Sequence, residues 1–192
     1  MKIILASSNA HKAKEINKIL QNTGIEVITY KDTGIEIDDI VEDGKTFKEN
    51  AYIKAKEIAK RVTLPVLSDD SGLVIDALDG FPGISTARFA SSCNGYDNAM
   101  NELNNRLIGK DTKASFVCVL CLLNYKEEPL YFVGEVKGNI VKPIKGDNGF
   151  GYDPAFKPLG YDKPFSLLDE NIKNSISHRY KAIKQLMDYL IA

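Results

Sequence analysis

The first thirty residues of the chain follow the pattern of a strand, a turn, a helix and a second strand. Residues 2–6 form a short β-rich run, after which apolar side chains recur at helical spacing as far as Gly24. Gly24 ends this helix, because glycine readily adopts the left-handed conformation found after the last helical turn. Residues 25–30 alternate as a second strand. The fold must therefore place a helix directly after its first strand.

Composition indicates one globular domain over residues 1–192. The chain is 44% hydrophobic and 27% charged, which is enough apolar material for one sizeable core. Its 25 Lys and Arg residues nearly balance its 26 Asp and Glu residues, giving a net charge of −1. This balance argues against a general duplex-binding surface, so no nucleic-acid partner is expected, although a local phosphate site remains open.

No membrane partner is expected either. The longest apolar run, residues 117–123, is much shorter than the roughly 20 residues that a spanning helix needs. The first residues lack the longer apolar stretch of a secretory signal, so a cytoplasmic location is expected. Cys93, Cys118 and Cys121 are expected to be reduced, because an odd number of cysteines in a chain of this length does not suggest a disulfide framework.

The remaining elements are predicted from hydrophobic spacing and from residues that interrupt it. Thr46 and Glu49 have the spacing of a capping box, which predicts a helix from residue 47 to about residue 62. Residues 66–68 and 73–75 are short apolar runs, and the polar residues between them predict a turn. The other expected elements are helices at 96–108 and 175–191 and strands at 114–124, 130–136 and 139–144.

The turn between the first strand and the first helix is a candidate phosphate site. It brings several backbone N–H groups and the positive end of the helix dipole to one point, at Ser8 and Asn9. Lys12, one turn into the helix, adds a positive charge. The alternative is an ordinary N-cap at Ser8 or Asn9 with a solvated lysine. No G-x-x-x-x-G-K-[ST] motif is present, so this site is not a P-loop.

Asp69 and Asp70, followed by Ser71, put two carboxylates where a strand is expected to end. Mg²⁺ is commonly held by one or two carboxylates together with substrate phosphates, and such a pair suits it. Glu42, on an acidic loop, is a second candidate ligand. The alternative is an Asx turn in which the aspartates accept hydrogen bonds from local backbone donors.

Two later segments carry groups that suit a nucleobase. Phe150 and Tyr152 offer aromatic faces for stacking and Asp153 offers a carboxylate, on a loop made permissive by glycines. The alternative is a turn with two packed aromatic residues. His178 and Arg179 begin the last expected helix and are hydrogen-bond donors suited to a keto oxygen or a phosphate. For the histidine alone, a structural role is the alternative.

Five short segments are more informative together than apart. They are Ser8-Asn9-Ala10-His11-Lys12, Asp69-Asp70-Ser71-Gly72-Leu73, Gly80-Phe81-Pro82-Gly83-Ile84-Ser85-Thr86-Ala87-Arg88-Phe89, Phe150-Gly151-Tyr152-Asp153-Pro154 and Ser177-His178-Arg179. In order and spacing, over essentially the whole chain, they resemble the inosine triphosphate pyrophosphatase family, the Ham1-like house-cleaning enzymes. The sequence departs from the family pattern at two places. Ser7-Ser8 stands where Thr-Gly is usual, and Asn171-Ile172 stands before Lys173, where the family usually has an acidic residue.

The resemblance implies an α/β fold with a long curved mixed β-sheet flanked by helices and two lobes around a central cleft. It implies hydrolysis of non-canonical purine nucleoside triphosphates (ITP, dITP and XTP) to the monophosphate and pyrophosphate by a Mg²⁺-dependent homodimer. Glu42 and Asp70 are then the metal ligands, Asp70 is also the proton acceptor for the attacking water, and Lys54 approaches the phosphates. The implied substrate-binding residues are Ser7, Ser8, Asn9, Ala10, His11 and Lys12 for the triphosphate, Ser71, and Phe150, Gly151, Tyr152, Asp153, Lys173, His178 and Arg179 around the base.

Two other functions compete with this interpretation. A Maf-like pyrophosphatase would act on pyrimidine or modified nucleotides, and a regulatory module would bind a nucleotide without turnover. For the favoured reading, Arg179 and a suitably protonated His178 are donors that pair with the keto group of inosine or xanthosine and oppose the amino group of adenine. Arg179 is therefore expected to discriminate ITP from ATP.

Overall fold

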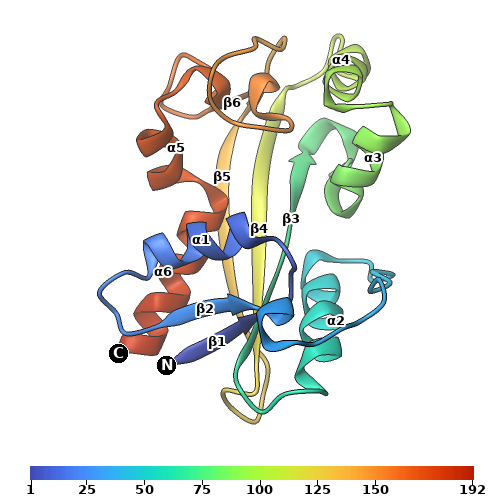
Figure 1. Ribbon diagram of the computed structural model, residues 1–192. Helices are drawn as coiled ribbons and strands as arrows, with labels where there is room; N and C mark the ends of the chain where they lie inside the picture. The colour runs from blue at the N-terminus through green and yellow to red at the C-terminus, as the bar shows by residue number, and fades with distance from the viewer. The chain divides into compact units, whose positions relative to one another are not determined.

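A computed structural model describes residues 1–192. Its helices are α1 (Ala10–Ile19), α2 (Phe47–Ala59), α3 (Thr86–Ser92), α4 (Tyr96–Arg106), α5 (Glu170–Ile176) and α6 (His178–Ile191) (Figure 1). Its strands are β1 (Lys2–Leu5), β2 (Glu26–Thr29), β3 (Val66–Ile75), β4 (Lys113–Leu123), β5 (Leu130–Ile140) and β6 (Phe156–Pro158). No helix is both long and apolar enough to cross a bilayer.

All six strands belong to one sheet with the order β2-β1-β3-β4-β5-β6. Strand β1 pairs in parallel with both β2 and β3, whereas β5 and β6 pair in antiparallel register. The sheet is therefore mixed, and the predicted α/β fold is confirmed. The successive strands β4 and β5 are neighbours in the sheet and are joined by residues 124–129, as the predicted hairpin requires.

The chain forms two compact units. Unit 1 comprises Met1–Asp70, Cys118–Gly134 and Arg179–Ala192, and unit 2 comprises Ser71–Val117 and Glu135–His178. Each unit has its own hydrophobic core, and each is described by itself below. The organisation of residues 1–192 as a single domain stays a prediction.

The core of unit 1 lies where α1 and α6 pack on β1. Ile3, Ile4 and Leu5 are all fully buried, so both faces of β1 are covered, as is usual for the central strands of a parallel sheet. The apolar stripes of α1 and α6 join this core at helical spacing. Its buried members are Ile3, Leu5, Ala13, Ile16, Leu20, Val27, Leu67, Cys118, Leu120, Leu122, Phe132, Ala182, Ile183 and Leu186. All three cysteines are free, as predicted, and Cys118 and Cys121 are buried.

Aromatic residues dominate the core of unit 2. The ring of Phe156 on β6 lies 4.5 Å from that of Phe116 and 5.5 Å from that of Phe165, measured between centroids. Helix α4 adds the stripe predicted from its sequence, with Ala99, Met100 and Leu103 buried. The loop that carries the candidate base-binding residues is therefore anchored to a large, well-packed cluster.

The predicted turn at residues 69–72 is wrong. Residues 66–75 form the single strand β3, so Asp69 and Asp70 lie within a strand and not at its end. The alternative of an Asx turn is excluded for the same reason. Lysines from other elements pair with both carboxylates, so neither aspartate depends on the local backbone donors that a turn would supply.

Three other elements differ from the predictions. The expected strand at 139–144 does not form: β5 continues to Ile140, Pro143 cannot donate to a ladder, and the antiparallel partner of β5 is β6. The expected helix at 175–191 is two helices, because Ser177 is extended, with ψ of 155°, and separates α5 from α6. Helix α3 was not expected. His178 does begin the last helix, as predicted.

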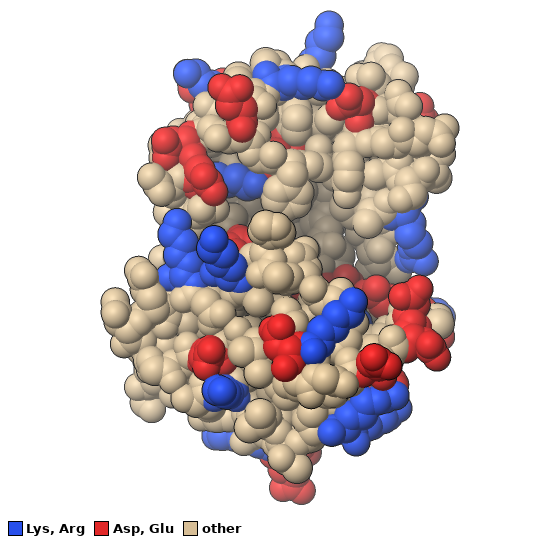
Figure 2. Space-filling model, viewed as in Figure 1, with Lys and Arg blue, Asp and Glu red and all other residues tan.

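Charged side chains of both signs are interspersed on the face drawn in Figure 2. No large patch of one sign stands out there, in keeping with the net charge of −1. The functional interest of the charges therefore lies in a few buried groups.

Candidate active site

The predicted site residues fall into two groups, one in each unit. Unit 1 holds Ser7, Ser8, Asn9, Ala10, His11, Lys12, Glu42, Lys54, Asp70 and Arg179. Unit 2 holds Ser71, Phe150, Gly151, Tyr152, Asp153, Lys173 and His178.

The turn between β1 and α1 is a capped helix N-terminus. Asn9 is the N-cap, and its side-chain oxygen accepts hydrogen bonds from the N–H groups of His11 at 3.0 Å and Lys12 at 3.2 Å. Ser7 accepts one from the N–H of Asn9. Ser8, which stands where glycine is usual in the family, does not have a positive φ and is accommodated without strain. The N-cap predicted as an alternative is thus present, at the positive end of the α1 dipole.

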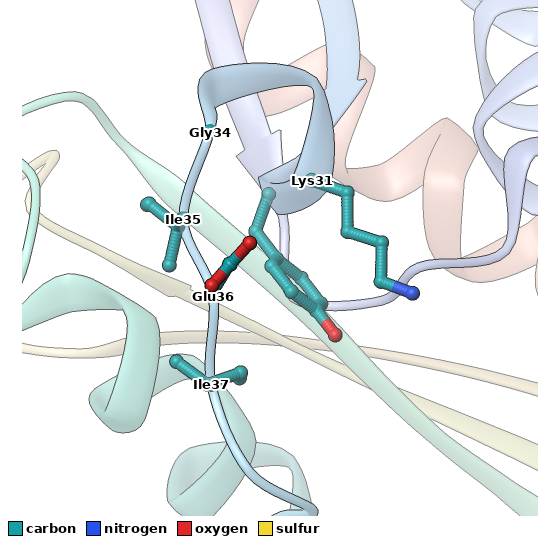
Figure 3. A pocket seen from close by; sticks show the side chains of 6 residues that line it. Lys31, Gly34, Ile35, Glu36 and Ile37 are labelled. Atoms are coloured by element: carbon teal, nitrogen blue, oxygen red, sulfur yellow. The ribbon is translucent and has the colours of Figure 1, made fainter.

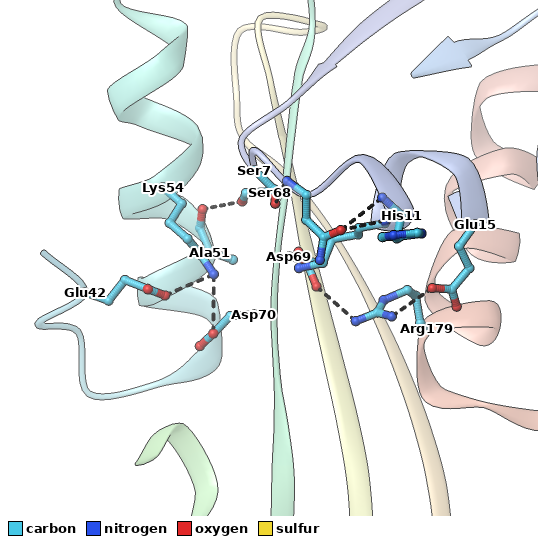
Figure 4. Close-up of polar contacts among 12 residues, drawn as sticks. Ser7, His11, Glu15, Glu42, Ala51, Lys54, Ser68, Asp69, Asp70 and Arg179 are labelled. Atoms are coloured by element: carbon cyan, nitrogen blue, oxygen red, sulfur yellow. Dashed lines mark hydrogen bonds and ion pairs between the residues drawn. The ribbon is translucent and has the colours of Figure 1, made fainter. Parts of the chain in front are cut away.

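Lys12 is not a solvated side chain. Its ammonium lies 2.9 Å from Asp69 Oδ1, and the Asp69 side chain is only 7% exposed. Burial alone would raise the pKa of Asp69, but the charges of Lys12, Arg179 and Lys54 hold this pKa well below its usual range. Asp69 is therefore an anchor that the surrounding cations keep ionised at neutral pH (Figure 4).

Arg179 contacts carboxylates of unit 1. Its guanidinium lies 3.1 Å from Glu15 on α1 and 3.7 Å from Asp69 on β3. It thus joins the start of α6 to both elements (Figure 4). Sequence reasoning found Arg179 itself but not its partner Glu15, since nothing in the spacing of residues 15 and 179 suggests a contact.

Lys54 on α2 bridges the two predicted metal ligands. Its ammonium lies 3.0 Å from Glu42 Oε1 and 3.5 Å from Asp70 Oδ1, and its side chain is only 18% exposed. Burial lowers the pKa of Lys54, but Asp69, Asp70 and Glu42 outweigh this effect and raise it, so the lysine stays charged. Glu42 and Asp70 are thus brought together around one cation, as Figure 4 shows.

Asp70 differs from its neighbour in how it is satisfied. Its Oδ2 is buried and accepts no hydrogen bond. Burial raises the pKa of Asp70 to about 6, with Glu42 and Asp69 acting in the same direction and Lys54 opposing them. An unpaired buried oxygen on a carboxylate with a raised pKa is typical of a group kept ready for a ligand or a proton.

A pocket elsewhere in unit 1 takes no part in this cluster. It has a volume of about 400 Å³ and lies on the loop after β2, where Tyr30, Lys31, Gly34, Ile35, Glu36 and Ile37 line it (Figure 3). None of the predicted site residues is among them.

In unit 2, Asp153 holds Lys173 beside an exposed aromatic ring. Asp153 Oδ2 lies 2.6 Å from the ammonium of Lys173 and accepts a hydrogen bond from the N–H of Phe150 at 2.8 Å. The Lys173 ammonium is 4.5 Å from the centre of the Phe150 ring, which is 71% exposed. Asp153 therefore fixes a donor next to an exposed aromatic ring.

The other unit 2 residues are less accessible. Tyr152 is buried: its hydroxyl donates to the carbonyl of Thr86, and its ring packs edge-on against Tyr96. Of the two predicted stacking rings, only Phe150 is exposed. The imidazole of His178 stacks on Phe116 at 5.2 Å. The hydroxyl of Ser71 is buried and has no hydrogen-bond partner.

Comparison with known proteins decides the family. The model of the Ham1 family matches residues 3–189. The chain belongs to the Ham1 family. It is 42% identical over 98% of its length to a dITP/XTP pyrophosphatase of Clostridium perfringens, covering 97% of that protein. A dITP/XTP pyrophosphatase of Oceanobacillus iheyensis is also 42% identical, with 98% of each chain covered. A solved Ham1 protein structure from Coxiella burnetii matches with a TM-score of 0.89 and 38% identity, covering 99% of this chain and 98% of that one.

Several residues that shape this Ham1 site were missed by sequence reasoning. Ser68, which is buried, donates to the carbonyl of Ala51 and ties β3 to α2. Asn50, also on α2, is 2% exposed. A signal for Asn50 exists in the sequence, because it lies four residues before Lys54 on one face of the helix and next to the small apolar residue Ala51.

Proposed function

We propose that this protein hydrolyses non-canonical purine nucleoside triphosphates, namely ITP, dITP and XTP, to the nucleoside monophosphate and pyrophosphate. Relatives named dITP/XTP pyrophosphatase support this substrate class. The observation that carries the proposal is the pair formed by Glu42 and Asp70 around Lys54, in which one buried oxygen of Asp70 has no partner. Such a set suits a reaction that needs both neutralised phosphate charge and an oriented water molecule.

Mg²⁺ is the cofactor that we assign to this pair. The donors fit the ion, because Mg²⁺ is usually bound through one or two carboxylates plus substrate phosphates, and the unpaired Asp70 Oδ2 is a free oxygen donor. No cluster of three or more potential metal ligands exists in the chain, so water and the substrate phosphates would supply the rest of the coordination. Glu42 and Asp70 are the residues assigned to hold the ion. When bound, it draws charge away from phosphorus.

Asp70 is assigned as the proton acceptor for the attacking water. A pKa of about 6 leaves this carboxylate ionised at neutral pH yet more basic than an ordinary aspartate. No covalent intermediate with the enzyme is needed, because water is the nucleophile and pyrophosphate is the leaving group. The water adds to phosphorus, its proton passes to Asp70, and the bond from phosphorus to the bridging oxygen breaks.

The triphosphate is assigned to the N-terminus of α1 and to two partly buried lysines. The helix dipole and the ammonium of Lys12 stabilise negative charge at this turn. Lys54 adds a second positive charge beside Asp70. The residues assigned to phosphate binding are Ser7, Ser8, Asn9, Ala10, His11 and Lys12.

The base is assigned to unit 2. Phe150 offers its exposed ring for stacking, and Lys173, which Asp153 holds in place, offers a donor for a keto oxygen. His178 is a second donor, and Ser71 contacts the substrate. Gly151 and Tyr152 shape the loop. A donor pocket accepts inosine and xanthosine and opposes adenine, which presents an amino group at the same position.

Arg179 receives a different role from the one that the sequence suggested. Its contacts are with Glu15 and Asp69, and the Asp69 carboxylate also anchors Lys12. These contacts favour a positioning role, in which Arg179 keeps Asp69 ionised and in place. Removal of Arg179 then impairs every substrate alike.

A panel of nucleotides tests the proposal. Release of pyrophosphate from ITP, dITP and XTP is measured beside release from ATP, GTP, CTP and UTP under identical Mg²⁺ concentrations. We expect turnover of the three non-canonical purines to exceed that of the common triphosphates. A preference for pyrimidines would instead support a Maf-like activity, and nucleotide binding without any release would support a regulatory module. The homodimer implied by the resemblance is part of the proposal, and sedimentation equilibrium tests it.

A further inference from the structure

The loop that carries Glu42 is attached to α2 by a buried amide. The side-chain oxygen of Asn50 accepts a hydrogen bond from the N–H of Gly44 at 2.9 Å, and Asn50 is 2% exposed. Asn50 lies in the first turn of α2, and Gly44 is only two residues after Glu42. A hydrogen bond from the loop backbone to this buried amide therefore joins α2 to the segment that carries the candidate metal ligand.

The attachment is tight on the glycine side as well. A Cβ at Gly44 would lie 2.6 Å from Asn50 Oδ1 and 2.8 Å from Glu49 Cβ. The φ of Gly44 is not positive, so the glycine is required by space and not by backbone conformation. The loop thus approaches α2 as closely as the backbone permits.

Two further bonds close the same corner. Thr46 caps α2 by accepting from the N–H of Glu49 at 3.1 Å, as the sequence predicted. The carboxylate of Glu49 reaches one residue further back than a capping box requires, to the N–H of Lys45 at 2.6 Å. These two contacts are exposed, whereas that of Asn50 is partly buried, so the amide is the contact least open to competition from water.

The helix fixes the other side of the site. Asn50 and Lys54 are four residues apart and lie on the same face of α2. Lys54 contacts both Glu42 and Asp70, and Ser68 on β3 donates to the carbonyl of Ala51. One turn of α2 therefore holds the loop through Asn50, the strand through Ala51, and the carboxylate pair through Lys54.

We propose that Asn50 is a positioning residue that holds Glu42 beside Asp70 through the N–H of Gly44. The inference rests on the proposed function, because it matters only if Glu42 is a metal ligand. The Glu42 side chain is 42% exposed and forms one ion pair, with Lys54, so its own contacts are insufficient to fix it. Residues that orient a ligand commonly affect metal affinity by about 10- to 100-fold when they are replaced.

Two variants break the contact from opposite sides. Asn50→Ala removes the acceptor, and Gly44→Ala forces a methyl group against it. We expect each to raise the Mg²⁺ concentration for half-maximal ITP hydrolysis by about 10-fold. Electron paramagnetic resonance, which counts free Mn²⁺, is expected to show weaker Mn²⁺ binding by the substrate-free protein. At saturating Mg²⁺, kcat and the KM for ITP should change little.

Non-additivity distinguishes this contact from a general loss of stability. Because both variants remove the same bond, the double variant should require no more Mg²⁺ than either single one. Asn17→Ala is the matched control: Asn17 is another amide in unit 1, bonded to the N–H and carbonyl of Val27 at 2.8 Å and 2.7 Å. Its loss should lower Tm without altering the Mg²⁺ requirement.

Glu42→Gln distinguishes failure of the metal assignment from failure of the positioning role of Asn50. If Glu42→Gln leaves Mn²⁺ binding and the Mg²⁺ requirement unchanged, Glu42 is not a metal ligand, and the proposed function of this pair fails first. If Glu42→Gln weakens the metal while Asn50→Ala and Gly44→Ala do not, the positioning role alone is overturned. A Mg²⁺ requirement that rises equally in Asn17→Ala also overturns it.

Discussion

Adjacent residues of β3 carry carboxylates in opposite electrostatic situations. Asp69 is paired with Lys12 and Arg179, which hold its pKa below the usual range. Asp70 shares one lysine with Glu42 and keeps a buried oxygen without a partner, and its pKa is raised to about 6. Because successive side chains of a strand point to opposite faces, neighbouring residues can have such different surroundings. When two neighbouring carboxyl groups have pKa values shifted in opposite directions, the group with the lowered pKa suits an anchor and the group with the raised pKa suits a general base.

Asp70→Asn tests the base at the residue scale. Asparagine keeps the size of the side chain but accepts no proton, so kcat for ITP should fall by about 10²–10⁴-fold. Circular dichroism should show an unchanged fold. Near-normal turnover by a folded Asp70→Asn protein would remove Asp70 from the catalytic role.

In the absence of metal, we expect Asp70→Asn to be more stable than the parent protein to an extent that depends on pH. The pKa of Asp70 is about 6 in the folded protein against an ordinary 3.8, so the folded state holds this proton more tightly and loses stability as pH rises from about 4 through 6. A pKa shift of this size lowers the free energy of unfolding of the parent protein by about 3 kcal/mol at pH 8. Urea unfolding in EDTA should therefore find Asp70→Asn more stable than the parent at pH 8 and equal to it near pH 3. A parent more stable at pH 8 would contradict the burial of an ionised Asp70.

Arg179→Ala distinguishes an anchor from a base-reading residue. Loss of one partner of a buried ion pair commonly costs about 3–5 kcal/mol, and Asp69 retains Lys12, so the expected loss of stability is at the lower end. We expect kcat/KM to fall by the same factor for ITP and ATP. A fall in kcat/KM confined to ITP would narrow the preference for ITP over ATP. That result would mean that Arg179 contacts the nucleobase.

At the scale of elements, the sequence predicted periodic segments well and polar interruptions poorly. Helices α1 and α4 and strands β1, β2 and β4 follow directly from apolar spacing, and α2 follows from the spacing of Thr46 and Glu49. The continuity of β3 through Asp69 and Asp70 could not be predicted, because it depends on cations supplied by α1 and α2. The break at Ser177 could not be predicted either, since nothing in the local pattern marks an extended residue there.

Gly149→Ala tests the loop that carries Phe150. Gly149 has a φ of +81°, and a Cβ there would lie 2.5 Å from Asp153 Oδ2, the atom that holds Lys173. We expect a rise in the KM for ITP that exceeds any fall in kcat, because the donor beside Phe150 is displaced. Gly160→Ala is the control, with a similar φ of +84° and no atom within 4 Å of the added Cβ. Equal effects of the two substitutions would mean that backbone strain alone is responsible.

At the scale of the whole molecule, five short motifs were sufficient for the family but not for the contacts among its residues. Among the residues named from the motifs, Lys12 pairs with Asp69 in unit 1 and Asp153 holds Lys173 in unit 2. Their pairing was hidden, because a contact such as that of Glu15 with Arg179 joins residues 164 positions apart. Burial and pairing also changed the interpretation of Tyr152, which packs inside unit 2.

We propose that water attacks the α-phosphate of a non-canonical purine triphosphate. Hydrolysis of ITP in water enriched in oxygen-18 tests it directly, with the products separated by chromatography and weighed by mass spectrometry. Attack at the α-phosphate predicts inosine monophosphate carrying one heavy oxygen and unlabelled pyrophosphate. Label in the pyrophosphate, or formation of the diphosphate and orthophosphate, would contradict the claim.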